Sequence, residues 1–136
     1  MIADSLDKTQ SAYAGQLLAD SALTTALGGA RVYDAVPHSQ SFPYVVLGSG
    51  VARDWSGQGT PGSELTLAFD VYSRSHGRSE VAQLAGLVSD ALTASDPSVS
   101  GYRVVLAEVT RIETDRLKDA KTYRARITLR VLVEPA

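Results

Sequence analysis

The two histidines, His38 and His76, are the residues whose type best suits acid–base chemistry, and serine and aspartate residues stand near both. These neighbours are Ser41 and Asp34 for the first histidine, and Ser75 and Asp70 for the second. A catalytic triad depends on the geometry of its members and not on their presence alone. The sequence also lacks the nucleophile-elbow pattern G-x-S-x-G. We therefore interpret both histidines as solvated loop residues and predict that the protein is not an enzyme.

Metal and phosphate chemistry have no support in the sequence either. There is no cysteine, and no close histidine pair such as H-x-x-x-H offers two metal ligands. The glycine-rich segment 56–62 lacks the lysine of a phosphate-binding P-loop. We expect no metal and no cofactor. Segment 56–62 is instead predicted to be a mobile hairpin loop that contacts partners, and its candidate contact residues are Ser56, Gly57, Gln58, Gly59 and Thr60.

The last predicted strand, over residues 122–133, has two different faces. Alternate residues from position 123 onward are apolar or aromatic and suit a core, whereas the other face carries Arg124, Arg126 and Arg130. Arginine suits interfaces because its planar guanidinium binds carboxylates through two hydrogen bonds. A solvated outer face, a subunit interface and a surface that lines a lumen all fit this pattern.

Composition is typical of an ordinary globular protein. The 136 residues suit one domain over 1–136, and the formal net charge of -2 gives no excess of basic residues for binding nucleic acid. No apolar run approaches the ~20 residues of a membrane span. The first residues lack the pattern of a signal peptide. We expect a soluble protein that is made in the cytoplasm and has no contact with membrane.

Periodicity predicts an α+β fold, with a mainly antiparallel sheet and two helices packed on one of its faces. A helical pattern runs from about residue 4 to 27, with a break near Asp20, and ends at the glycine pair 28–29. An apolar stripe predicts a second helix after Ser79, which we expect to be its N-cap. Strands are predicted at 32–33, 44–55, 65–72, 102–114 and 122–133, with a charged hairpin connection over 115–121.

Two stretches of the chain resemble the tail-completion (tail-terminator) proteins of long-tailed bacteriophages. The first runs from Gly28 to Gly48 and includes the sequences GGARVYD, VP and SFPYVVLG. The second is LAFDVYSR at 67–74, followed by Gly77, Arg78 and a helix. The family often has tryptophan where Tyr72 stands. The motifs are structural and point to no active site, and similar proteins occur in gene transfer agents, which are phage-like particles.

The resemblance implies a structural virion protein at the junction of tail and neck. Six copies are expected to form a ring that caps the tail tube, contacts the tail tube protein on one side and a neck or stopper protein on the other, and lets DNA pass through the lumen without specific binding. Two alternatives remain open at this point: another neck component, such as a stopper or adaptor, and a small ligand-binding domain.

For the arginine face, this setting favours a protein interface over DNA, because DNA must slide through a tail without being held. The expected partners are acidic residues of a neighbouring subunit, with candidates Asp54, Glu64, Asp70 and Glu113. On this hypothesis, charge reversal of Arg126 leaves the monomer folded and stops the subunits from joining.

Overall fold

The structure of the protein is a computed structural model that describes residues 2–57, 59–75 and 77–136. Within these ranges the chain forms helices and strands with the following bounds: α1 Ile2–Ala19, α2 Ser21–Leu27, β1 Val32–Tyr33, β2 Tyr44–Asp54, β3 Ser63–Ser73, α3 Ser79–Thr93, β4 Tyr102–Arg116 and β5 Tyr123–Pro135. The strands form one sheet in the order β1-β2-β3-β5-β4. All neighbouring strands are antiparallel except β1 and β2, which are parallel.

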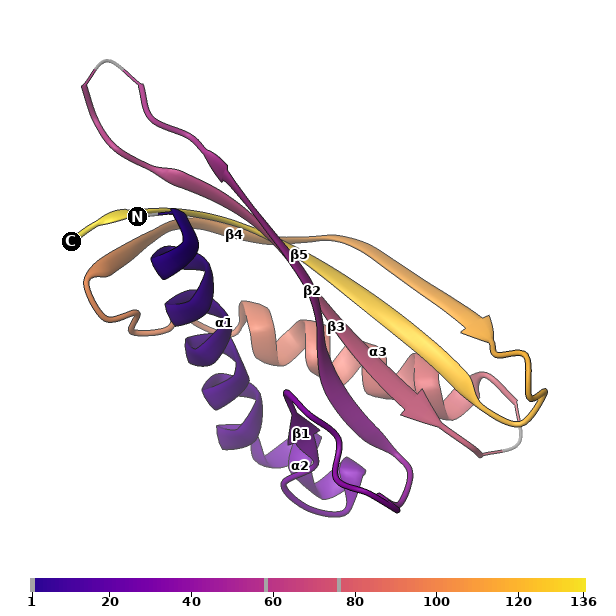
Figure 1. Ribbon diagram of the computed structural model, residues 1–136. Helices are drawn as coiled ribbons and strands as arrows, with labels where there is room; N and C mark the ends of the chain where they lie inside the picture. The colour runs from indigo at the N-terminus through magenta and orange to yellow at the C-terminus, as the bar shows by residue number, and fades with distance from the viewer. Residues whose placement is uncertain (1, 58, 76) are drawn as a thin grey trace.

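The helices lie on one face of the sheet, as predicted (Figure 1). The break near residue 20 separates α1 from a distinct helix, α2, so the described residues form three helices where two were predicted. Asp20 is the N-cap of α2, and its Oδ1 accepts a hydrogen bond of 2.9 Å from the Leu23 amide. Gly28 ends α2 in the left-handed conformation, at φ 84°, which glycine adopts without strain.

The hydrophobic core fills the space between the helices and the sheet. The predicted core face of β5 is buried from Ala125 to Val133, and α3 contributes its predicted stripe. Among the largest fully buried side chains of this core are Tyr13 and Leu17 of α1 and Phe69 of β3. Burying this much apolar area supplies the main force for folding.

Two local predictions differ from the structure. Ser79 is the first residue of α3 and not its N-cap, which is Arg78 without a side-chain capping bond. β3 was expected to bury one face, but Ala68 and Asp70 on its other face are buried as well. The reason is position: β3 lies between β2 and β5, so a strand flanks it on each side, and the guanidinium of Arg126 on β5 binds Asp70.

Two hairpins extend the sheet at opposite ends (Figure 1). The hairpin of β2 and β3 reaches beyond the helices, and we refer to its outer part, residues 51–66, as the arm. The turn between β4 and β5 lies at the other end, near the start of α3. Among the described residues, none of the helices is long and apolar enough to span a membrane.

Candidate interaction surfaces

Of the two histidines, His38 lies within the described residues, whereas His76 and the predicted contact residue Gln58 lie outside them. His38 is exposed in the connection between β1 and β2. Among the described side chains, no hydrogen bond joins it to Ser41 or Asp34. No group of three or more potential metal ligands occurs in the part of the chain that the structure describes. The chemistry of this chain therefore has to be sought at its surfaces.

The outer face of the sheet, which points away from the helices, carries the three predicted arginines in a set of ion pairs. Arg126 and Asp70 lie directly opposite each other on β5 and β3. The guanidinium binds both carboxylate oxygens, with Nε to Oδ1 at 2.8 Å and Nη2 to Oδ2 at 2.9 Å. The side chain of Asp70 is only 7% exposed, so this pair is the most enclosed of the set. Such a two-bond geometry is the strongest that a guanidinium and a carboxylate form.

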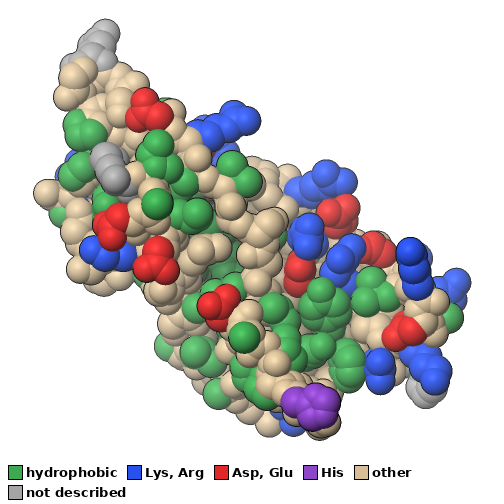
Figure 2. Space-filling view, viewed as in Figure 1, with side chains coloured by type: hydrophobic (Ala, Val, Ile, Leu, Met, Phe, Trp, Pro, Cys, Tyr) green, Lys and Arg blue, Asp and Glu red, His purple; other side chains and the backbone are tan. Residues whose placement is uncertain are grey.

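The other two arginines have partners on the neighbouring strands. Arg124 binds Asp115 of β4 at 2.7 Å, and Arg130 binds both Glu64 of β3 at 2.8 Å and Glu108 of β4 at 3.2 Å. Figure 2 shows acidic and basic side chains alternating along this side of the molecule. We use the name ion-pair ladder for the three arginines together with their four acidic partners, which are Glu64, Asp70, Glu108 and Asp115.

The ladder follows from the register of the strands. Residues opposite one another on antiparallel strands share a face, so Asp115 faces Arg124, Asp70 faces Arg126 and Glu108 faces Arg130. The hydrogen bonds that Arg124, Arg126 and Arg130 donate to Asp115, Asp70 and Glu64 raise the pKa of all three guanidinium groups above the ordinary arginine value, and desolvation by burial opposes the shift. All three arginines therefore stay charged and held in place.

This arrangement corrects one expectation from the sequence. Glu64 and Asp70 were expected to serve as partners from a neighbouring subunit, but both bind arginines of their own chain. Glu113 binds Arg111 within β4 at 3.1 Å. Asp54 is the remaining candidate: it is exposed, and its Oδ1 accepts a hydrogen bond from the Ser56 hydroxyl at 2.6 Å.

The predicted contact loop forms the tip of the arm. Ser56, Gly57, Gly59 and Thr60 are all exposed. The hairpin bonds continue into the tip, with the amide of Gly57 donating to the carbonyl of Thr60 at 3.0 Å and the reverse bond at 2.8 Å. Sequence reasoning missed Trp55 beside this loop, which is 42% exposed. The available signal was the single tryptophan of the chain next to a glycine-rich turn.

The motifs that suggested a family come together in one aromatic cluster. Tyr44 stacks on Tyr72 of the neighbouring strand with ring centroids 5.5 Å apart, and Phe42 lies 5.0 Å from Tyr44. The guanidinium of Arg74 lies over the Phe42 ring at 4.5 Å from its centroid. These residues, which are separate in the sequence, thus tie the start of β2 to the end of β3.

Comparisons with known proteins agree with these features. A family model described as "Tail completion protein gp17" matches residues 12–134. A chain in the solved structure titled "Virion of native gene transfer agent (GTA) particle" is 33% identical, with 98% of this chain and 97% of that chain covered and a TM-score of 0.86. The structure titled "Structure of bacteriophage SPP1 gp17 protein" is 21% identical over 96% of this chain and 91% of that chain, with a TM-score of 0.61. At this identity the likeness supports a shared fold and nothing further. A search of curated proteins gave no match.

The fold, its surfaces and these matches define a structural component of phage-type virions. The chain belongs to the tail completion protein gp17 family. Its role is therefore structural, in joining the tail within a virion, and it is not an enzyme. The resemblance seen in the sequence and the predicted virion location are both confirmed.

Proposed function

We propose that six copies of this chain form a ring at the junction of tail and neck. The ring would cap the tail tube, contact the tail tube protein on one face and a neck or stopper protein on the other, and leave a lumen for DNA. The observation that carries this proposal is the 33% identity to a chain of a gene transfer agent virion, which extends over 98% of this chain. Both hairpins of the fold fall within that similarity.

The edge of the sheet supports contacts between subunits. Among the described strands, β4 is an edge strand of 15 residues whose only neighbour is β5, and large apolar side chains are exposed along it at Val105, Leu106 and Ile112. An unpaired edge of this length attracts further protein contacts. Register shifts near residues 104–106 and 109–111 interrupt the edge and limit pairing with arbitrary strands.

The ion-pair ladder supports the proposal that this face of the sheet does not bind DNA, whether it lines the lumen or lies on the outside of the ring. Binding to the phosphate backbone requires positive charges that are available to neutralise phosphates. In the ladder, each of the three arginines is already bound to a carboxylate of its own chain. We therefore propose that DNA passes this protein without specific binding, and that the arginine face contacts protein where it contacts anything.

The test is the number and position of copies in an assembled particle. A reconstruction of the tail–neck junction is expected to show one closed ring of six copies on the last tail-tube ring. Sedimentation velocity on the isolated protein is expected to show a monomer at low concentration, because ring closure requires contacts with the tube. A stable closed dimer in both settings would contradict the proposal.

A further inference from the structure

The arm carries an exposed aromatic side chain, Trp55, beside the exposed acid Asp54, next to the loop at its tip. The amide of Trp55 donates to the carbonyl of Gly62 at 2.8 Å, and the indole lies against Gly62, where a Cβ atom would be 2.9 Å from Trp55 Cε3. Asp54 precedes it and takes part in no ion pair among the described residues. A large aromatic side chain that is exposed at a protruding hairpin has the properties of an interface anchor.

The opposite end of the sheet carries a hollow that suits such an anchor. It is lined by six residues of the β3–α3 connection and the β4–β5 turn: Arg74, Ser75, Gly77, Ala120, Lys121 and Tyr123. Arg74 is fixed there, because its Nε donates to the Thr122 hydroxyl at 3.0 Å and its guanidinium lies over Phe42. We call this site the basic hollow.

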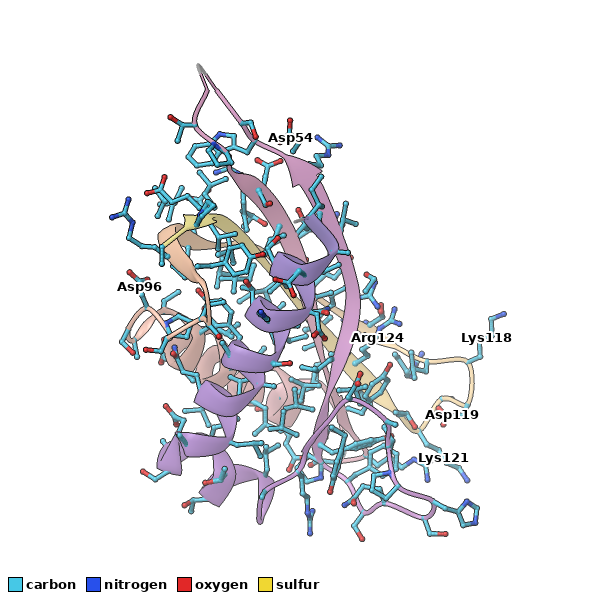
Figure 3. All side chains as sticks on the ribbon, turned by 60° about the vertical axis from the view of Figure 1, so that its left-hand side comes forward. Asp54, Asp96, Lys118, Asp119, Lys121 and Arg124 are labelled. Atoms are coloured by element: carbon cyan, nitrogen blue, oxygen red, sulfur yellow. The ribbon has the colours of Figure 1, made fainter. Side chains whose placement is uncertain are left out.

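Unpaired positive charge gathers around the basic hollow. Arg78, Arg116, Lys118 and Lys121 are exposed and take part in no ion pair among the described residues. Figure 3 shows Lys118 and Lys121 at the opposite end of the molecule from Asp54. The arginines of the ladder are paired with carboxylates, whereas among the described residues the exposed cations of the basic hollow and the exposed acid Asp54 at the arm have no ion pair.

We infer that the arm tip of one copy docks into the basic hollow of the next copy, with Trp55 against the cations and Tyr123, and Asp54 paired with Lys121 or Lys118. This inference rests on the proposed ring and names the surfaces that close it. An indole gains energy from a cation over its face, and more so when water is excluded.

A second copy is the partner that these observations favour. A ring is built from heterologous contacts, in which each subunit presents two different surfaces that fit each other. The arm tip and the basic hollow are such a pair, and they lie at opposite ends of one chain. The neighbouring cation Arg53 does not oppose the contact, because alternation places it on the other face of β2, opposite Glu64.

Cysteine cross-linking tests the contact, since the chain has no cysteine of its own. Thr60 at the arm tip and Ser75 in the basic hollow are both exposed. In assembled particles, the double variant Thr60→Cys/Ser75→Cys is expected to oxidise to a ladder of covalent oligomers that reaches the size of the ring. The matched control Thr60→Cys/Ser98→Cys, whose second cysteine is exposed but remote from the basic hollow, is expected to stay monomeric on a denaturing gel.

Charge exchange gives an independent test. Asp54→Lys makes both surfaces positive, and Lys118→Glu/Lys121→Glu makes both negative, so each variant alone is expected to fail to form rings. Mixed together on tail tubes, the two are expected to form rings of alternating copies in a one-to-one ratio. Trp55→Ala is expected to raise the concentration needed for assembly by at least about tenfold. Asp90→Lys, an exposed reversal on α3, should leave assembly unchanged.

The outcomes separate the contact from the ring itself. Rings that form from either charge-reversed variant alone, or rings that cross-link through the control pair and not the test pair, would overturn the docking of arm tip in basic hollow while leaving the ring intact. Wild-type particles that contain no ring of this chain would overturn the proposed function, and this inference with it.

Discussion

Arg126 and Asp70 hold the outer face of the sheet together at the point where it is most enclosed. Removing the guanidinium with Arg126→Met leaves the buried carboxylate without its partner. We expect the free energy of unfolding to fall by about 1–3 kcal/mol, less than for a fully buried pair because Arg126 is 34% exposed. Urea unfolding at pH 7 measures this loss. The matched control Arg111→Met, on an exposed pair of the same face, should change stability by less than ~0.5 kcal/mol.

The same pair changes how the arginine face should be tested. Arg126→Glu would bring a third carboxylate close to Asp70 and Glu113, both of which already lie on this face. The subunit itself is therefore expected to lose stability, and failed assembly of this variant would not identify an interface. The contact role of Arg124, Arg126 and Arg130 stays a prediction, and it is better tested at Arg130, whose partners are more exposed.

Asp119 organises the β4–β5 turn and makes it sensitive to acid. Its carboxylate accepts hydrogen bonds from the Thr122 hydroxyl at 2.7 Å and from the amides of Lys121 and Thr122 at 2.9 Å each. These bonds lower the pKa of Asp119 from 3.8 to about 2, with the Thr122 hydroxyl as the largest cause.

Because the folded-state pKa is lowered, the stability that Asp119 contributes is present above about pH 4 and is lost as the pH falls toward 2. We expect Asp119→Ala to be less stable than wild type at pH 5 and 7, and the difference to shrink as the pH falls through about 2. Thermal unfolding of both proteins across this range measures it. A difference that is the same at pH 2 and pH 7 would contradict the assignment.

At the scale of elements, the sequence predicted most of the helices and strands but not their pairing. The stripe of α3, the glycine stop after α2 and the alternation of β5 are local patterns, so they appear directly in the sequence. The ion-pair ladder depends on which residues of β3, β4 and β5 face each other. That register is set by turns and by packing between residues up to 66 positions apart, and no local pattern records it.

The arm depends on a close contact that only glycine allows. A Cβ atom at Gly62 would lie 2.9 Å from Trp55 Cε3 and 3.1 Å from the Trp55 carbonyl oxygen, so the indole would have to move. Gly62→Ala is expected to leave the core folded and to shift the tryptophan fluorescence toward that of a solvated indole, while assembly weakens. Gly15→Ala in α1, where a Cβ meets nothing within 4 Å, should instead stabilise the protein by roughly 0.5–1 kcal/mol.

At the scale of the whole molecule, folding and assembly use different parts of the chain. The core lies between the helices and the middle of the sheet, while the arm tip and the β4–β5 turn extend from opposite ends (Figure 1). Sequence reasoning identified the arm tip from its glycines. It could not identify the basic hollow, because Arg74 and Lys121 are distant in sequence and meet only once β3 and β5 are paired.

The arm tip should therefore be dispensable for folding and necessary for joining the tail. Replacing residues 56–61 with Asn-Gly keeps a two-residue turn that suits a β-hairpin, and the described residues that it removes are all exposed. We expect the free energy of unfolding to change by less than ~1 kcal/mol, because the entropy of loop closure depends only logarithmically on loop length, and we expect the variant to fail in tail attachment.

The free wild-type subunit is expected to show fast amide exchange at residues 56–62, because ordering such a segment costs roughly 1–2 kcal/mol per residue and requires a partner. Slowly exchanging amides there in the monomer, or particles that assemble normally without the tip, would show that the arm is not a contact element.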